Sequence, residues 1–88
     1  MIRNHLSRIL GEKRWSQAHL ARVTGIRPAT INYIYNELAE KISMEHLDRI
    51  CEALDCTVAD LLEYQPNAQR KTGKDLIVEE HGNQKKNR

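Results

Sequence analysis

Residues 17–36, Gln17-Ala-His-Leu-Ala-Arg-Val-Thr-Gly-Ile-Arg-Pro-Ala-Thr-Ile-Asn-Tyr-Ile-Tyr-Asn36, decide the fold of this chain. The stretch predicts two short helices joined by a tight turn. Gly25 can take a positive φ without steric cost, so it can end the first helix at that turn. Pro28 lacks an N–H and suits the first turn of the second helix, where that donor has no partner within the helix.

The apolar residues of this stretch predict how the two helices pack. Leu20 and Ala21 form the inner face of the first helix, and the small Ala21 side chain lets the helices cross closely. Ile31 and Ile34 are three residues apart and form the inner face of the second helix, over residues 28–36. A helix pair of this kind can place its second helix in the major groove of DNA.

Three further helices are predicted outside the central pair. The first covers residues 2–13, because its apolar residues recur at helical spacing: Ile2, Leu6, Ile9 and Leu10. Trp15 follows as a lid on the core, and Ser16 is the N-cap of the next helix.

The fourth helix starts after Ser43, beyond a loop over residues 37–42 that Ile42 anchors. Its inner face consists of Leu47, Ile50, Cys51 and Leu54. Thr57-Val-Ala-Asp60 resembles a capping box that starts a fifth helix, with Val58, Leu61 and Leu62 facing inward. No strand is predicted in residues 1–64.

Composition changes at residues 65–67 and divides the chain into a helical domain, residues 1–64, and a polar basic tail, residues 65–88. Within the tail, residues 75–79 form a possible short strand, because Leu76, Ile77 and Val78 favour β structure. A single strand needs a partner for its backbone groups, and a second copy of the chain is one candidate. Otherwise such a polar tail is expected to be mobile.

Length and composition restrict the class of protein. The 88 residues are 40% apolar with no Phe, which fits one small domain with an aliphatic core. No apolar run is long enough to span a membrane, and the start lacks a signal-peptide pattern, so we expect a cytoplasmic protein. Charge is uneven: residues 1–41 carry seven Lys and Arg against three Asp and Glu, whereas residues 42–64 carry one against six. One basic end suits binding to phosphates, although a mixed surface would look similar.

The chain resembles the phage-repressor/Cro-like (XRE) helix-turn-helix family over about residues 2–64. The resemblance lies in residues 15–26, in Ile31 and Ile34, and in the closing stretch over residues 47–62. It implies an all-α, five-helix lambda-repressor-like DNA-binding domain. It also implies a sequence-specific transcriptional regulator that binds a palindromic operator on double-stranded DNA as a homodimer. Members are mostly repressors or activators, and we expect a repressor here. The chain departs from the family at Thr24, usually aliphatic, and at Arg27, where a Ser or Thr cap is common.

Family geometry and helix periodicity together give the candidate DNA contacts. Candidates for base contact lie along the groove-facing side of the second helix: Arg27, Pro28, Ala29, Asn32 and Tyr33. Candidates for backbone contact are Arg14, Gln17, Thr30, Asn36 and Lys41. Arg27 could read guanine with two hydrogen bonds or simply bind a phosphate. Pro28 and Ala29 could touch a thymine methyl or only allow close approach, and Tyr33 could contact DNA or pack over the helix.

Other classes of function have weaker support in the sequence. No catalytic constellation, cofactor motif or metal-ligand pattern is visible, so we expect neither an enzyme nor a metal site. Cys51 and Cys56 are read as two small core residues, because free Cys is commonly buried. The main alternative is an antitoxin-type or other protein-interaction module whose tail binds a protein partner, with DNA binding retained for autoregulation.

Overall fold

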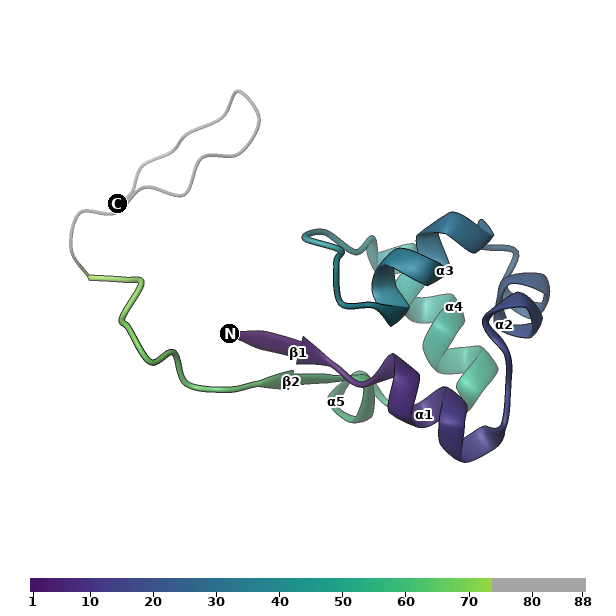
Figure 1. Ribbon diagram of the computed structural model, residues 1–88, viewed down its shortest axis with the longest axis horizontal. Coiled ribbons are helices and arrows are strands. Elements are labelled where there is room, and N and C mark those ends of the chain that lie inside the picture. Colours follow the sequence, from purple (N-terminus) through teal and green to yellow (C-terminus); the bar gives the residue numbers. More distant parts are fainter. Residues whose placement is uncertain (74–88) are drawn as a thin grey trace, which may run out of the picture.

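The helix pair predicted over residues 17–36 is present in the computed structural model, which describes residues 1–73 (Figure 1). α2 covers Gln17–Thr24 and α3 covers Pro28–Tyr35. The Ser16 hydroxyl caps α2 by accepting from the His19 N–H at 3.0 Å. Gly25 ends α2 at φ 74°, and Pro28 is the first residue of α3. Each of these features was predicted from the residue that forms it: Ser16, Gly25 or Pro28.

Thr24, the departure from the family pattern, is buried and fully hydrogen-bonded. Its hydroxyl donates to the Leu20 carbonyl at 2.7 Å and accepts from the Ile26 N–H at 3.2 Å. A buried hydroxyl is costly only when it lacks partners, so a polar residue is tolerated here. The two bonds also fix the backbone on either side of Gly25 and so help to define the turn between the helices.

The remaining helices are α1 (Leu6–Lys13), α4 (Met44–Leu54) and α5 (Val58–Leu61), which makes five within residues 1–73. Ser43 caps α4 by accepting from the His46 N–H at 2.9 Å, and Thr57 and Asp60 form the predicted capping box of α5.

The core is aliphatic, as predicted. It consists of Leu6, Ile9, Leu10, Leu20, Ala21, Ile26, Ile31, Ile34, Ile50, Leu54 and Leu61. No helix in residues 1–73 is long and apolar enough to cross a membrane.

Several half-buried residues pack against this core. Trp15 covers one side, and its ring meets the His19 ring edge-to-face with centroids 4.6 Å apart. Ile42 anchors the loop before α4, as predicted. Cys51 and Cys56 also pack on the core as free thiols, which confirms their predicted role as small core residues. Burial raises the pKa of the Cys56 thiol to about 11, and its contact with Cys51 adds to this effect.

The prediction of a first helix over residues 2–13 is wrong at its N-terminal end. Ile2–Asn4 form a strand, β1, that pairs antiparallel with β2, Leu62–Tyr64 (Figure 1). In this pair Ile2 stands opposite Tyr64. Ile2 is 63% exposed instead of lying in the core. The cause is a distant partner: the His5 N–H donates to the Leu61 carbonyl at 2.7 Å. Spacing along the sequence cannot reveal a bond between residues so far apart.

Two further details near α5 differ from prediction. Val58 is 51% exposed rather than inward-facing, because α5 is a single turn and only Leu61 reaches the core. Leu62 does pack against the core, but it does so from β2, so the expectation of no strand in residues 1–64 is wrong. The possible strand at residues 75–79 lies outside the described residues.

Three helices end at residues other than glycine in the left-handed conformation. These residues are Arg14 after α1, Glu37 after α3 and Asp55 after α4, with φ of 58°, 58° and 52°. In each case the next N–H bonds back to the carbonyl five residues earlier: Trp15 to Leu10, Leu38 to Tyr33 and Cys56 to Cys51. This is the Schellman arrangement, in which glycine is the usual left-handed residue. No glycine stands at any of these three positions, so glycine could not mark these helix ends in the sequence.

Replacing Asp55 with glycine should therefore stabilise the domain. The left-handed conformation costs a residue with a Cβ about 1 kcal/mol, part of which is offset by the greater freedom of glycine in the unfolded chain. We expect the free energy of unfolding to rise by roughly 0.5 kcal/mol, measured by chemical denaturation. Asp48→Gly inside α4 is the matched control and should be destabilising. A fall in stability for Asp55→Gly would contradict the argument.

Candidate nucleic-acid interface

The outer side of α3 presents the predicted base-contacting residues to solvent. Arg27, Pro28 and Ala29 are exposed at the start of the helix, and Tyr33 is 59% exposed one turn later. Ile31 and Ile34 are buried on the opposite side. This division follows from the helical repeat, because the apolar residues hold one face on the core and leave the other outward. The prediction of an exposed outer face on α3 is therefore confirmed, while its contact with DNA remains a prediction.

Polar side chains link the start of α2 to α3. The Asn32 amide donates to the Gln17 Oε1 atom at 3.2 Å, and the Asn36 amide donates to the Asn32 carbonyl at 3.0 Å. Three residues predicted to contact DNA are therefore joined into one chain of hydrogen bonds across the helix pair. Gln17 is thus held in position beside the N-terminus of α2, where the unpaired N–H groups favour an anion.

A groove of about 360 Å³ runs between α3, the loop that follows it and the start of α4. Its lining combines apolar and polar side chains: Ala29, Thr30, Tyr33, Ile34, Ala39, Lys41, Ile42 and His46. Thr30 and Lys41, both predicted backbone contacts, therefore border the same hollow as Tyr33. His46 also borders it and was not a sequence candidate. It lies on the next helix, and no local motif relates it to α3.

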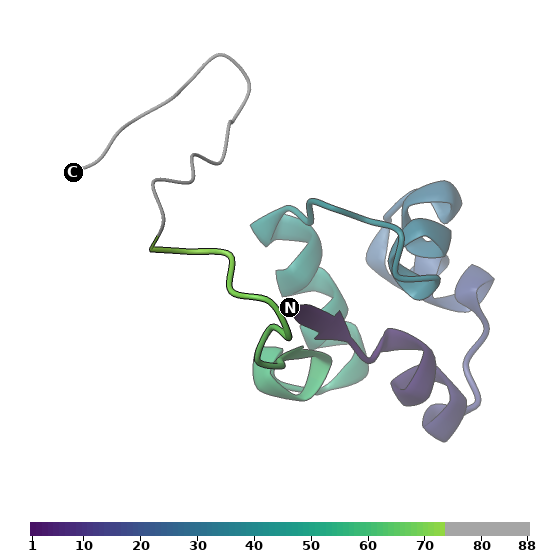
Figure 2. The same ribbon diagram turned by 60° about the vertical axis from the view of Figure 1, so that its left-hand side comes forward.

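Arg14 is separate from the other candidates. It ends α1 in the left-handed conformation, in the connection to α2, and that connection lies at the far end of α1 from α3 in both views (Figures 1 and 2). The structure therefore gives Arg14 a local part in ending α1. It does not bring Arg14 together with the exposed side of α3.

An ion pair lies just beyond the C-terminal end of α3. The helix itself contains no acidic residue, but Glu37 follows it. Arg3 of β1 donates through Nε to Glu37 Oε1 at 2.7 Å and through Nη2 to Oε2 at 2.9 Å. These hydrogen bonds hold the pKa of Glu37 below its usual range and raise the pKa of Arg3. The carboxylate beside the proposed DNA surface is therefore ionised and paired with a cation.

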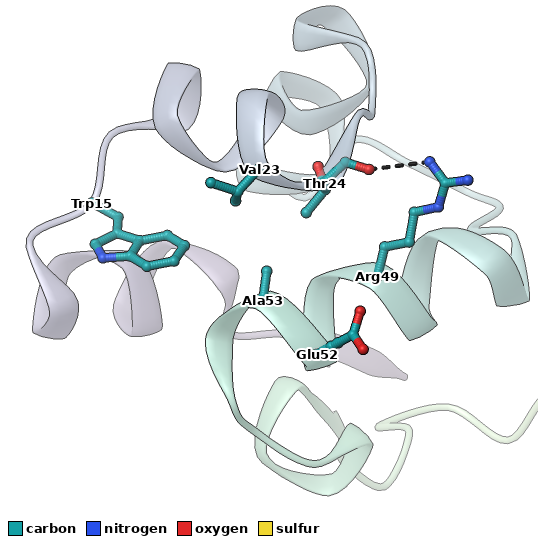
Figure 3. A pocket seen from close by; sticks show the side chains of 6 residues that line it. All are labelled: Trp15, Val23, Thr24, Arg49, Glu52 and Ala53. Atoms are coloured by element: carbon teal, nitrogen blue, oxygen red, sulfur yellow. Dashed lines mark hydrogen bonds between the residues drawn. The ribbon is translucent and has the colours of Figure 1, made fainter.

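A second hollow of about 450 Å³ lies on another side of the domain (Figure 3). Trp15, Val23 and Thr24 border it from the α1–α2 connection and α2, and Arg49, Glu52 and Ala53 border it from α4. Arg49 donates to the Thr24 carbonyl at 3.1 Å, so this arginine supports the C-terminal end of α2. The hollow is lined by no residue of α3, and Arg49 stabilises the fold through its bond to the Thr24 carbonyl.

Comparison with known proteins gives two matches. The family described as the Cro/C1-type HTH DNA-binding domain matches residues 5–67. The Bacillus subtilis (strain 168) protein named "Uncharacterized HTH-type transcriptional regulator YozG" is 33% identical over 57 residues, which cover 65% of this chain and 68% of that protein. The family match includes the whole of the α2–α3 pair and therefore the exposed side of α3 described above.

Proposed function

This chain belongs to the Cro/C1-type family of helix-turn-helix DNA-binding regulators, and we propose that it reads a specific DNA sequence by placing α3 in the major groove. The observation that carries the proposal is the exposed side of α3. It offers Arg27, Ala29 and Tyr33 without an acidic residue in the helix. The chain would act by binding rather than by catalysis, and most simply as a repressor.

The proposed contacts fall into two groups. Arg27 would read guanine, and Pro28 and Ala29 would allow a thymine methyl close to the start of α3. Asn32 and Tyr33 would complete the base contacts. Phosphate contacts would come from the backbone candidates that lie on or next to the α2–α3 pair, namely Gln17, Thr30, Asn36 and Lys41, whereas Arg14 lies apart from them. Such contacts position the protein on the duplex without selecting a sequence.

We further propose that two copies bind a palindromic operator. A single domain of this size offers one short recognition helix, and one half-site rarely provides enough contacts for tight specific binding. Two half-sites joined by a dimer add their binding energies. The expected spacing between half-site centres is about one helical turn of DNA, roughly 34–36 Å.

The test is selection of binding sites from a random duplex library at two salt concentrations, followed by sequencing of the bound duplexes. Enrichment of a palindromic motif would support a specific dimeric regulator. Enrichment of one half-site would support sequence reading by a monomer. Weak binding that enriches no sequence and depends strongly on salt would contradict the proposal, because it would show only attraction to phosphates.

Lys41→Ala should weaken binding to the selected duplex and to random duplex by the same factor. A phosphate contact carries no sequence information, and its loss lowers the slope of log affinity against log salt by about one. Binding measured at four salt concentrations would check both effects. Lys13→Ala, at the exposed end of α1, is a control with the same charge change. An effect on the selected duplex alone would contradict the phosphate role.

A further inference from the structure

The Arg3–Glu37 ion pair joins two parts of the molecule that are 34 residues apart in sequence. Both oxygens of the carboxylate are engaged, at 2.7 and 2.9 Å, so the guanidinium holds it in one orientation. The i,i+4 pair Arg8–Glu12 differs, because a single contact at 3.3 Å joins two residues of one helix. Arg3–Glu37 is therefore a long-range tie between β1 and the end of α3.

Glu37 occupies a backbone position where glycine is the usual residue. It is the left-handed residue of the Schellman turn that ends α3, at φ 58°. Its own N–H bonds to the Ile34 carbonyl at 3.0 Å, and the Leu38 N–H bonds to the Tyr33 carbonyl at 2.9 Å. Glycine would adopt this conformation more easily. The backbone bonds hold this conformation, as they do at Arg14 and Asp55, and the ion pair with Arg3 additionally holds the Glu37 side chain.

The other end of the tie is also held in place. Arg3 stands opposite Glu63 in the β1–β2 pair. Bonds on both sides extend the pairing: the His5 N–H donates to the Leu61 carbonyl at 2.7 Å, and the Gln65 N–H donates to the Met1 carbonyl at 2.8 Å. The ribbon is thereby attached to α5 and the core. Arg3 consequently connects a fixed strand to the residue that starts the loop over residues 37–43.

That loop carries part of the proposed DNA surface. Lys41 lies four residues after Glu37 and borders the groove beside Tyr33. We propose that Arg3 is a positioning residue for DNA binding: by holding Glu37 it fixes the C-terminal end of α3 and the loop that carries Lys41. Arg3 need not touch DNA to do so. The inference rests on the proposed function, since it concerns the same surface.

The test compares single substitutions at both ends of the tie with matched controls. Arg3→Gln and Glu37→Gln should each weaken binding to the library-selected duplex by about fivefold. The result for Glu37→Gln is the decisive one, because this change removes a negative charge and would strengthen DNA binding if net charge alone mattered. The controls Arg8→Gln and Glu12→Gln make the same charge changes on α1, where only the ordinary charge effect is expected.

Further measurements separate positioning from simple destabilisation. Thermal unfolding should show that all variants are folded at the assay temperature. Loss of an ordered Lys41 contact should lower the salt slope of Arg3→Gln and Glu37→Gln, whereas a smaller folded fraction would leave the slope unchanged. The exchanged pair Arg3→Glu with Glu37→Arg should recover at least half of the lost affinity.

The outcomes distinguish this inference from the proposed function. If the wild type selected a sequence and Glu37→Gln bound that duplex as tightly as the wild type or more tightly, the positioning role alone would be overturned. Single variants that weaken binding with an unchanged salt slope, or an exchanged pair without recovery, would overturn it as well. A wild-type chain that selects no sequence from the library would overturn both.

Discussion

Arg27→Ala is expected to lower affinity for the selected duplex at least tenfold and to relax the preference at one base pair in each half-site. Arg27 is exposed directly before Pro28, at the N-terminal end of α3. In the proposed family geometry this end of the helix lies nearest the bases. A guanidinium with two hydrogen bonds to guanine contributes about 1–3 kcal/mol of discrimination against the wrong base. In the proposed dimer the contact would be made twice, so the substitution would weaken binding at both half-sites.

The measurement is binding to the selected duplex, to variants changed at each base pair and to random duplex. Arg22→Ala is the control, because it removes an exposed arginine from α2 whose guanidinium lies near His19. That control should weaken all duplexes slightly and alike. If Arg27→Ala lowered affinity for selected and random duplexes by the same factor, Arg27 would be a phosphate contact and not a base-reading residue.

Leu20→Ala should lower the free energy of unfolding by about 3 kcal/mol and leave little folded protein. Leu20 is completely buried in α2, the helix that packs on both α3 and α4. Removing most of a buried leucine loses its transfer free energy and leaves a cavity that the surrounding chain fills only partly. A domain of this size has only a small margin of stability, so one such loss is a large part of the total.

Chemical denaturation followed by circular dichroism would check this result. Val23→Ala in the same helix is the control, because Val23 is 51% exposed and its truncation removes little buried surface. The affinity of Leu20→Ala for the selected duplex should fall with the folded fraction and recover at low temperature or in an uncharged osmolyte such as sucrose. Similar stability losses in both variants would mean that the core is less tightly packed around Leu20 than the structure indicates.

The candidate site was predictable to the extent that it depends on local pattern. Ile31 and Ile34 specify which side of α3 is buried, and their spacing therefore leaves Arg27, Ala29 and Tyr33 outside. The hydrogen bond between Asn32 and Gln17 and the presence of His46 in the groove that Lys41 also lines were not predictable. Those relations join different helices, and their geometry depends on how the helices cross.

The sequence by itself determined that five helices form, the caps at Ser16, Gly25, Ser43 and Thr57, and most of the inner faces, because each depends on residues within a few positions of one another. Ser16, Gly25, Pro28 and Ser43 act on their own neighbours, so their effects can be read along the chain. The tertiary structure alone decided that Ile2–Asn4 is a strand and that Arg3 meets Glu37. Both results depend on partners more than thirty residues away, and the free energy of a distant contact outweighs the local helical preference.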